Sequence, residues 1–252
     1  MKARAVPATA MAETDGSRLF LLVCAWGVHL YTASGAVFGV LAIYYAGIGD
    51  YRASFIAMAV TIAIDSSDGT LARYFNVKKR VPGFDGALLD NIVDYLTYVV
   101  VPVYLVIHAG MVVGTIGFAG AGFVLIASAY QFCQTDAKTD DHFFLGFPSY
   151  WNLVVFYLYC LHWGPVANEL VLAMFAIMVF VPIKYIYPSR TKPLRPLTVT
   201  LAIVWGIITI AMLPSLPSVN PILLYLSLSY IAYYFIASFA LHASSLLARP
   251  AS

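Results

Sequence analysis

Long apolar segments alternate with short polar or Gly/Pro-containing breaks along almost the whole chain. A membrane-spanning helix needs about 20 apolar residues, and eight segments approach or exceed this length. They cover residues 19–46, 52–75, 84–108, 112–133, 149–163, 165–187, 197–213 and 220–246. The fifth is short and the seventh only just long enough, so a count of six or seven stays open. The pattern predicts an all-α polytopic membrane protein with about eight transmembrane helices.

The composition agrees with this prediction. Of the 252 residues, 62% are hydrophobic and 10% are charged, whereas soluble domains carry about 25% charged residues. The first apolar run is too long for a signal-peptide core and lacks a convincing cleavage site, so we expect it to remain as a membrane helix. We therefore expect one transmembrane domain at 19–247, flanked by tails at 1–18 and 248–252.

The basic residues predict the orientation, because cytoplasmic loops are rich in Lys and Arg. With eight spans and a cytoplasmic N-terminus, eleven of the fourteen basic residues fall in cytoplasmic segments. These are Lys2, Arg4, Arg18, Lys78, Lys79, Arg80, Lys138, Arg190, Lys192, Arg195 and Arg249. Arg73 and Lys184 fall at cytoplasmic helix ends, and Arg52 alone faces the other side. Both termini are therefore expected in the cytoplasm.

Four aspartates lie inside the second and third apolar segments. Asp65 and Asp68 precede the short turn at 76–83, and Asp90 and Asp94 follow it. At about 1.5 Å per residue, Asp68 and Asp90 lie roughly 10 Å from this turn, and Asp65 and Asp94 roughly 16 Å. Helical spacing puts each pair on one face of its helix. Two antiparallel helices would therefore bring all four carboxylates together in the cytoplasmic third of the membrane.

A carboxylate inside a bilayer is costly, so such a cluster indicates a functional site. Hard divalent cations such as Mg²⁺ or Mn²⁺ prefer all-oxygen ligands and often bridge to substrate phosphates. Gly69 and Ala72 lie on the same face as Asp65 and Asp68 and leave a groove, and Arg73 offers a fork suited to phosphate oxygens. The pattern favours transfer of a phosphate-bearing group at a metal site. A cation or proton pathway is the alternative from another class, and a purely structural role is the weakest reading.

Residues 65–94 read Asp65-x2-Asp68-Gly69-x2-Ala72-Arg73-x12-Gly86-x3-Asp90-x3-Asp94. This motif resembles the signature of the CDP-alcohol phosphotransferases, membrane enzymes that join a CDP-activated lipid or alcohol to a second alcohol and release CMP. The resemblance covers about an eighth of the chain directly. Members usually have eight or nine residues between the Arg and the second Gly, and this chain has twelve. The insertion lengthens the cytoplasmic turn and leaves both helix faces undisturbed.

The longer spacing, the eight-span count and the stretch 25–32 (AWGVHLYT) resemble the bacterial phosphatidylcholine synthases. That resemblance implies CDP-diacylglycerol and free choline as substrates, with phosphatidylcholine and CMP as products. Choline is a quaternary ammonium, which aromatic faces hold well. Tyr31, in the resembling stretch, and Tyr98, next along the face of Asp94, are therefore the candidate choline ligands. Interfacial anchoring or core packing is the alternative for any tyrosine here.

The resemblance also implies roles for the motif residues. Asp65, Asp68, Asp90 and Asp94 would bind Mn²⁺ or Mg²⁺, and Asp94 would in addition act as the catalytic base. The CDP site would be formed by Asp65, Gly69, Ala72, Arg73 and Gly86. Relatives tend to be homodimers in the bacterial inner membrane, so we expect the same here, with lipid as the surrounding partner and no nucleic acid.

Three sister reactions fit the motif equally well, those that form phosphatidylserine, phosphatidylglycerophosphate or phosphatidylinositol-type lipids. An acceptor that carries a phosphate should need additional cations, and Lys184, Arg190, Lys192 and Arg195 are candidates. His29 stands singly in an apolar helix and is expected to be a hydrogen-bonded packing residue. A cation transporter remains the alternative from another class, although transporters often show two related halves, and no internal repeat is visible.

Overall fold

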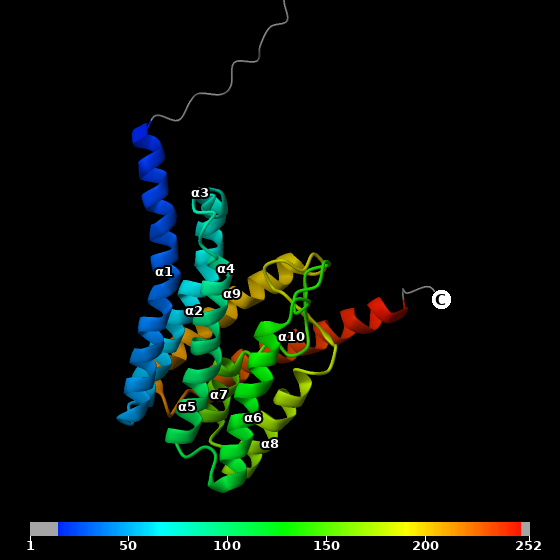
Figure 1. The fold of residues 1–252 in the computed structure, drawn as a ribbon. Helices are drawn as coiled ribbons and strands as arrows, with labels where there is room; N and C mark the ends of the chain where they lie inside the picture. The colour runs from blue at the N-terminus through cyan, green and yellow to red at the C-terminus, as the bar shows by residue number, and fades with distance from the viewer. Residues whose placement is uncertain (1–14, 248–252) are drawn as a thin grey trace, which may run out of the picture.

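A computed structural model describes residues 15–247 of the chain (Figure 1). The first described helix covers Asp15–Gly47, so it includes residues of the predicted N-terminal tail. The rest of the predicted N-terminal tail, the C-terminal tail 248–252, and with them Lys2, Arg4 and Arg249, lie outside the described residues.

The described residues form an almost entirely helical protein, which confirms the predicted fold class. The helical elements before the first strand are α1 (Asp15–Gly47), α2 (Tyr51–Tyr74), α3 (Val77–Arg80), α4 (Gly86–Asp94), η1 (Tyr95–Val100), α5 (Val101–His108) and α6 (Gly114–Cys133). The later elements are β1 (Phe143–Leu145), α7 (Trp151–Leu161), α8 (Pro165–Met178), β2 (Lys184–Ile186), α9 (Arg195–Met212), η2 (Leu213–Ser215) and α10 (Pro221–Leu247).

Six helices in the described chain are long and apolar enough to span a membrane, and α7 and α8 are shorter. The predicted helix 165–187 is wrong in its last part, because α8 ends at Met178 and residues 184–186 form β2. Pro182 explains the end of the helix: it has no N–H for a helical hydrogen bond and disfavours a helical residue before it. All eight predicted segments contain a helix, but only six are of spanning length.

The third predicted span is one helix of three parts, α4, η1 and α5. Its middle part is a π-helix, in which the Val101 N–H donates to the carbonyl of Leu96, five residues earlier. Pro102 follows directly, and its ring cannot lie against the carbonyl of Tyr98 in a regular α-helix. The wider turn begins at Tyr95, so it changes the direction of the side chains that follow Asp94.

Helix α1 packs closely against α2 and against α4 and η1. Gly35 and Gly39 are one turn apart on α1. A Cβ at Gly35 would come within 2.8 Å of the Val93 side chain, and a Cβ at Gly39 within 3.2 Å of the Thr97 side chain. Such small residues let membrane helices approach closely. Helix α4 begins at a defined point because the Asp85 side chain accepts hydrogen bonds from the Ala87 and Leu88 N–H groups, both at 3.0 Å. The acidic faces of α2 and α4 are thereby fixed beside each other.

The segment 134–150 and the segment 179–194 are joined at the same end of the molecule as α3 (Figure 1). Strands β1 and β2 pair antiparallel, with Phe144 opposite Tyr185. Two side-chain contacts add to this pairing: Lys184 Nζ of β2 lies 2.5 Å from Asp141 Oδ2, and Thr191 Oγ1 donates to the His142 carbonyl at 2.5 Å. We call this joined pair of segments the strap. Helices α9 and α10 leave it as a hairpin that crosses the other helices obliquely (Figure 1).

Candidate active site

Three aspartates from α2 and α4 form a compact carboxylate cluster. One oxygen each of Asp65, Asp68 and Asp90 lies within 4.8 Å of the other two. Asp68 is buried, with 6% of its surface exposed, and the other two are half-buried. Carboxylate oxygens at this spacing are the donor set that hard divalent cations take, so the residues present fit a metal ion. We call these three residues the carboxylate cluster.

Two hydroxyl groups orient the cluster from outside it. Thr32 Oγ1 on α1 donates to Asp68 Oδ2 at 2.7 Å, and the Tyr98 hydroxyl on η1 donates to Asp65 Oδ2 at 2.6 Å. Hydrogen bonds to ligating carboxylates fix their orientation and tune metal affinity. The carboxylates come from α2 and α4, and hydroxyl groups of α1 and η1 hold two of them in place.

Asp94 stands apart from the carboxylate cluster. It does not belong to the group whose oxygens approach within 4.8 Å, but it lines the same cavity as Asp65 and Asp90. The structure therefore brings three of the four predicted carboxylates together within this limit and places Asp94 in the same cavity, and the metal roles of all four stay predictions.

A first cavity, of about 580 Å³, opens on one side of the cluster between α1, α2 and the turn before α4. Small residues form much of its wall, among them Gly69, Ala72 and Gly86, together with Asp68 and Asp90 of the cluster. A Cβ at Gly86 would come within 2.7 Å of the His29 ring, so only glycine fits there without movement of that ring. We call this space the glycine-lined cavity.

His29 lines the glycine-lined cavity. The sequence predicts a hydrogen-bonded packing residue at this position. It is 7% exposed, and its Nε2 has no hydrogen-bond partner within the described residues. Its ring lies 4.5 Å from Phe84 and 5.7 Å from Trp26, measured between ring centroids. A buried polar atom without a partner, on a residue that lines a cavity, is suited to contact a ligand.

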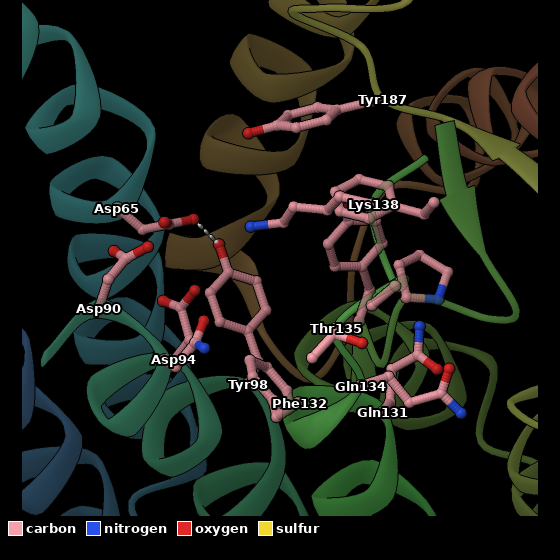
Figure 2. Close-up of a pocket in the computed structure, with 15 residues that line it drawn as sticks. Asp65, Asp90, Asp94, Tyr98, Gln131, Phe132, Gln134, Thr135, Lys138 and Tyr187 are labelled. Atoms are coloured by element: carbon pink, nitrogen blue, oxygen red, sulfur yellow. Dashed lines mark hydrogen bonds between the residues drawn. The ribbon is translucent and has the colours of Figure 1, made fainter. Parts of the chain in front are cut away.

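A second cavity, of about 240 Å³, lies on the other side of the cluster and reaches the strap. Asp65, Asp90 and Asp94 stand at one end, and the rings of Tyr98, Phe144, Tyr150 and Tyr187 line the rest with other residues. Figure 2 shows the Lys138 ammonium extending across this space toward Asp65. Its charge acts on all three carboxylates at that end. We call this space the tyrosine-lined cavity.

The other predicted site residues lie outside both cavities. Arg73 is exposed on the last turn of α2 and donates to the Thr70 hydroxyl at 2.9 Å. The Tyr31 hydroxyl shares a 2.9 Å hydrogen bond with the Ser67 hydroxyl. Arg73 and Tyr31 are not among the residues that line the two cavities. The CDP role of Arg73 and the choline role of Tyr31 stay predictions.

Sequence reasoning missed Tyr150, Tyr187 and Lys138 as site residues. All three come from the strap, at 44 (Lys138), 56 (Tyr150) and 93 (Tyr187) positions after Asp94, the last residue of the motif, so no regular spacing relates them to it. The available signal was compositional: aromatic residues concentrate at 143–151 and 185–187, next to polar breaks between apolar segments.

Comparison with known proteins identifies the family. No family model matches the chain. A phosphatidylcholine synthase from Legionella pneumophila is 43% identical over 222 residues, which cover 85% of this chain and 87% of that protein. A protein of the same name from Borreliella burgdorferi is 40% identical over 73% of this chain and 78% of that protein. Another, from Pseudomonas aeruginosa, is 33% identical over 83% of this chain and 88% of that protein. The chain belongs to the phosphatidylcholine synthase family.

Membership of the phosphatidylcholine synthases confirms the predicted resemblance to the CDP-alcohol phosphotransferases. It also confirms an enzyme of the transferase class in phospholipid biosynthesis, built as a membrane protein. The alternative of a cation transporter loses its basis, because the relatives are named as synthases over most of the chain's length.

Proposed function

We propose that this phosphatidylcholine synthase condenses CDP-diacylglycerol with choline at the carboxylate cluster. The choline hydroxyl oxygen forms a bond to the β-phosphorus, the phosphorus that carries the diacylglycerol. The phosphoanhydride bond breaks and CMP leaves, while the hydroxyl proton passes to a carboxylate. The position of the cluster between two cavities carries this proposal, since a reaction of two substrates needs two sites that meet at the reacting atoms.

We assign the nucleotide to the glycine-lined cavity. Gly69, Ala72 and Gly86 leave room for a flat ligand to approach the backbone, and its volume is the larger of the two. Arg73, at the cytoplasmic end of α2, would reach phosphate oxygens as a charged fork. Asp68 lines this cavity and Asp65 lines the other one, so the two carboxylates would lie on either side of the diphosphate.

We assign Asp94 as the base that accepts the choline proton. It lies in the tyrosine-lined cavity near the cluster without belonging to it. Mn²⁺ or Mg²⁺, held by Asp65, Asp68 and Asp90 with Asp94 close by, would neutralise negative charge on the diphosphate and on the departing CMP. The acyl chains would remain in the surrounding lipid.

The first experiment measures CMP release from CDP-diacylglycerol by the purified protein in lipid, with Mn²⁺ or Mg²⁺. Choline, serine, glycerol 3-phosphate and inositol are compared as acceptors. We expect release that depends on choline. Release with another acceptor alone would keep the family and overturn the choline assignment, and no release with any acceptor would overturn the transferase activity itself.

Asp94→Asn tests the assignment of the base. We expect turnover to fall by about a hundredfold or more, the range that general-base catalysis contributes, while CDP-diacylglycerol still binds in the presence of metal. Binding is followed separately by titration of the inactive variant with the nucleotide lipid. Near-normal turnover by Asp94→Asn would show that another group takes the proton.

We also propose a homodimer in the bacterial inner membrane, with both termini cytoplasmic. The clustering of Lys78, Lys79, Arg80 and Lys138 at one end of the molecule supports this orientation. A membrane-impermeant maleimide should label Ser218→Cys from the periplasm and label Lys79→Cys only after lysis, in a variant without the native cysteines. Cross-linking in native membranes tests the dimer.

A further inference from the structure

The aromatic rings of the tyrosine-lined cavity form one continuous wall. Tyr98 lies 6.0 Å from Tyr150, and Tyr150 lies 6.2 Å from Phe144 edge to face, measured between ring centroids. Phe144 in turn stacks on Tyr187 at 4.5 Å. All four rings line the cavity that also holds Asp94. We call this row of four rings the aromatic wall.

The aromatic wall is built by segments far apart in sequence. Tyr98 comes from the π-helical turn, Phe144 from β1, Tyr150 from the residue before α7, and Tyr187 from the residue after β2. The strap therefore brings three of the four rings to the one that the motif helix supplies. The Tyr98 hydroxyl is already engaged by Asp65, which leaves its ring as the surface available to a ligand.

A quaternary ammonium has no N–H group to donate, so hydrogen bonding cannot recognise it, whereas the faces of aromatic rings attract it electrostatically. We propose, resting on the proposed function, that Tyr98, Phe144, Tyr150 and Tyr187 form the subsite for the trimethylammonium group of choline. The short alcohol arm then reaches Asp94 at the acidic end of the same cavity.

Three further observations support a small cationic ligand here. The volume of about 240 Å³ is below the range of about 300–1,000 Å³ that holds drug-sized ligands. Of the described basic residues, Lys138 alone lines the cavity, and Lys184, Arg190, Lys192 and Arg195 do not, so a phosphate-bearing acceptor lacks a cluster of cations. The Lys138 ammonium itself extends between Tyr187 and Tyr98 (Figure 2), so the cavity already accommodates a positive charge.

The test compares choline with 3,3-dimethyl-1-butanol, an alcohol of the same shape in which an uncharged carbon replaces the nitrogen. We expect the wild-type enzyme to prefer choline by about tenfold or more in kcat/KM, from the attraction of several ring faces. Tyr187→Leu and Tyr150→Leu should each raise the KM for choline by about three- to tenfold. Their kcat/KM for the uncharged alcohol should stay close to the wild-type value.

Two control variants separate the ring from the hydroxyl and from general destabilisation. Tyr187→Phe keeps the ring and should keep the preference for choline. Tyr130→Leu removes an exposed tyrosine that does not line the cavity, and it should change the kcat/KM for neither alcohol. If the leucine variants do not fold, tetramethylammonium is the second probe. It should inhibit the wild-type enzyme in competition with choline and not with CDP-diacylglycerol.

The outcomes separate this inference from the proposed function. A wild-type enzyme that releases no CMP with choline contradicts the proposed function. If the wild-type enzyme uses choline but the leucine variants keep the wild-type preference for choline over the uncharged alcohol, the subsite is wrong and the function stands. Equal loss with both alcohols, or failure of tetramethylammonium to compete with choline, would likewise overturn the subsite.

Discussion

The two cavities on either side of the carboxylate cluster are built in opposite ways. The glycine-lined cavity takes its walls from α1, α2 and the start of α4, and the absence of side chains at Gly69 and Gly86 creates the space. The tyrosine-lined cavity takes most of its walls from the strap and is shaped by large rings. One side thus exposes backbone to a ligand, and the other surrounds it with aromatic faces.

The difference indicates how one family fold can vary its substrate. A nucleotide diphosphate shared by all the sister reactions needs close backbone approach and metal ligands, which a fixed motif on two helices supplies. The acceptor differs between the sister reactions. The cavity that we propose for it is formed in large part by loop and strand residues, which can change without disturbing the cluster. If the two cavities act independently, a change in one should alter the KM of one substrate and leave the KM of the other constant.

The largest effect is expected where the two cavities meet. Asp68→Asn replaces a buried cluster carboxylate by a neutral amide, and the activity should fall by about 100- to 1,000-fold, because a metal contributes several kcal/mol of charge stabilisation. Mn²⁺ binding, followed by electron paramagnetic resonance of the free ion, should weaken in parallel. Both substrates should be affected, since the cluster serves both cavities.

Asp140→Asn is the matched control, because Asp140 is exposed and lines neither cavity. It should leave Mn²⁺ binding and turnover unchanged. Normal Mn²⁺ binding by Asp68→Asn would instead remove Asp68 from the ligand set and leave the metal on Asp65 and Asp90.

A smaller effect, confined to one side, is expected from Gly69→Ala. A Cβ there meets the protein only at Arg73 Nη1, at an ordinary contact distance of 3.5 Å, and alanine favours the helix by about 1 kcal/mol. The variant should therefore fold at least as stably as the wild type. Its KM for CDP-diacylglycerol should nevertheless rise about tenfold, equivalent to about 1.4 kcal/mol, because the methyl group takes space from the nucleotide. The KM for choline should not change.

Gly120→Ala provides the comparison on α6, where a Cβ meets no other atom within 4 Å. It should gain similar helix stability without any change in either KM. A rise in the choline KM of Gly69→Ala would break the proposed separation of the two cavities.

Lys138→Met tests a charge that faces the cluster from the tyrosine-lined side. Because the Lys138 ammonium faces these carboxylates, it should compete with a bound cation for them. Its removal should therefore lower the Mn²⁺ concentration for half-maximal activity by about two- to fivefold, the modest effect of a charge that solvent screens. Lys138→Arg should behave like the wild type, and Lys192→Met, outside both cavities, should have no effect. A higher Mn²⁺ requirement in Lys138→Met would place the ammonium on the diphosphate instead.

The sequence was sufficient to predict the cluster because its geometry is local. Asp65, Asp68 and Asp90 lie on two helices joined by one short turn, so helical periodicity alone determines which side chains face each other. The same logic places Asp94 in the cavity beside Asp65 and Asp90, but Asp94 lies just before the π-helical turn, and its role as a metal ligand stays a prediction. Pro102 was the visible sign that the helix would not stay regular.

The aromatic wall could not be predicted in the same way. Tyr150 and Tyr187 reach the cavity through the β1–β2 pairing, and residues 179–187 were interpreted as the end of a helix. A three-residue strand has too few positions to show an alternating pattern, and its partner strand lies about forty residues earlier. Contacts between distant segments of this kind depend on tertiary packing, which no local pattern encodes.

The smallest effect is expected from the ion pair that joins the strap outside the membrane. Partial burial raises the pKa of Asp141, but hydrogen bonds from Lys184 and Thr139 outweigh it and hold the pKa below its ordinary value. A carboxyl with a lowered folded-state pKa stabilises the protein above the unfolded-state pKa, about 4, and loses this contribution as the pH falls through the lowered value. The Asp141 side chain is 53% exposed, so solvent screening keeps the effect below about 1 kcal/mol.

Asp141→Asn should therefore lower thermal stability slightly at pH 7, and the difference from the wild type should disappear as the pH falls below about 4. Thermal unfolding in detergent at both pH values measures this. Because the ion pair lies beside β1, which carries Phe144 of the aromatic wall, the choline KM should rise by less than about twofold and the CDP-diacylglycerol KM should stay constant. An equal change in both constants would mean that the strap supports the whole active site, and that the two cavities are mechanically one.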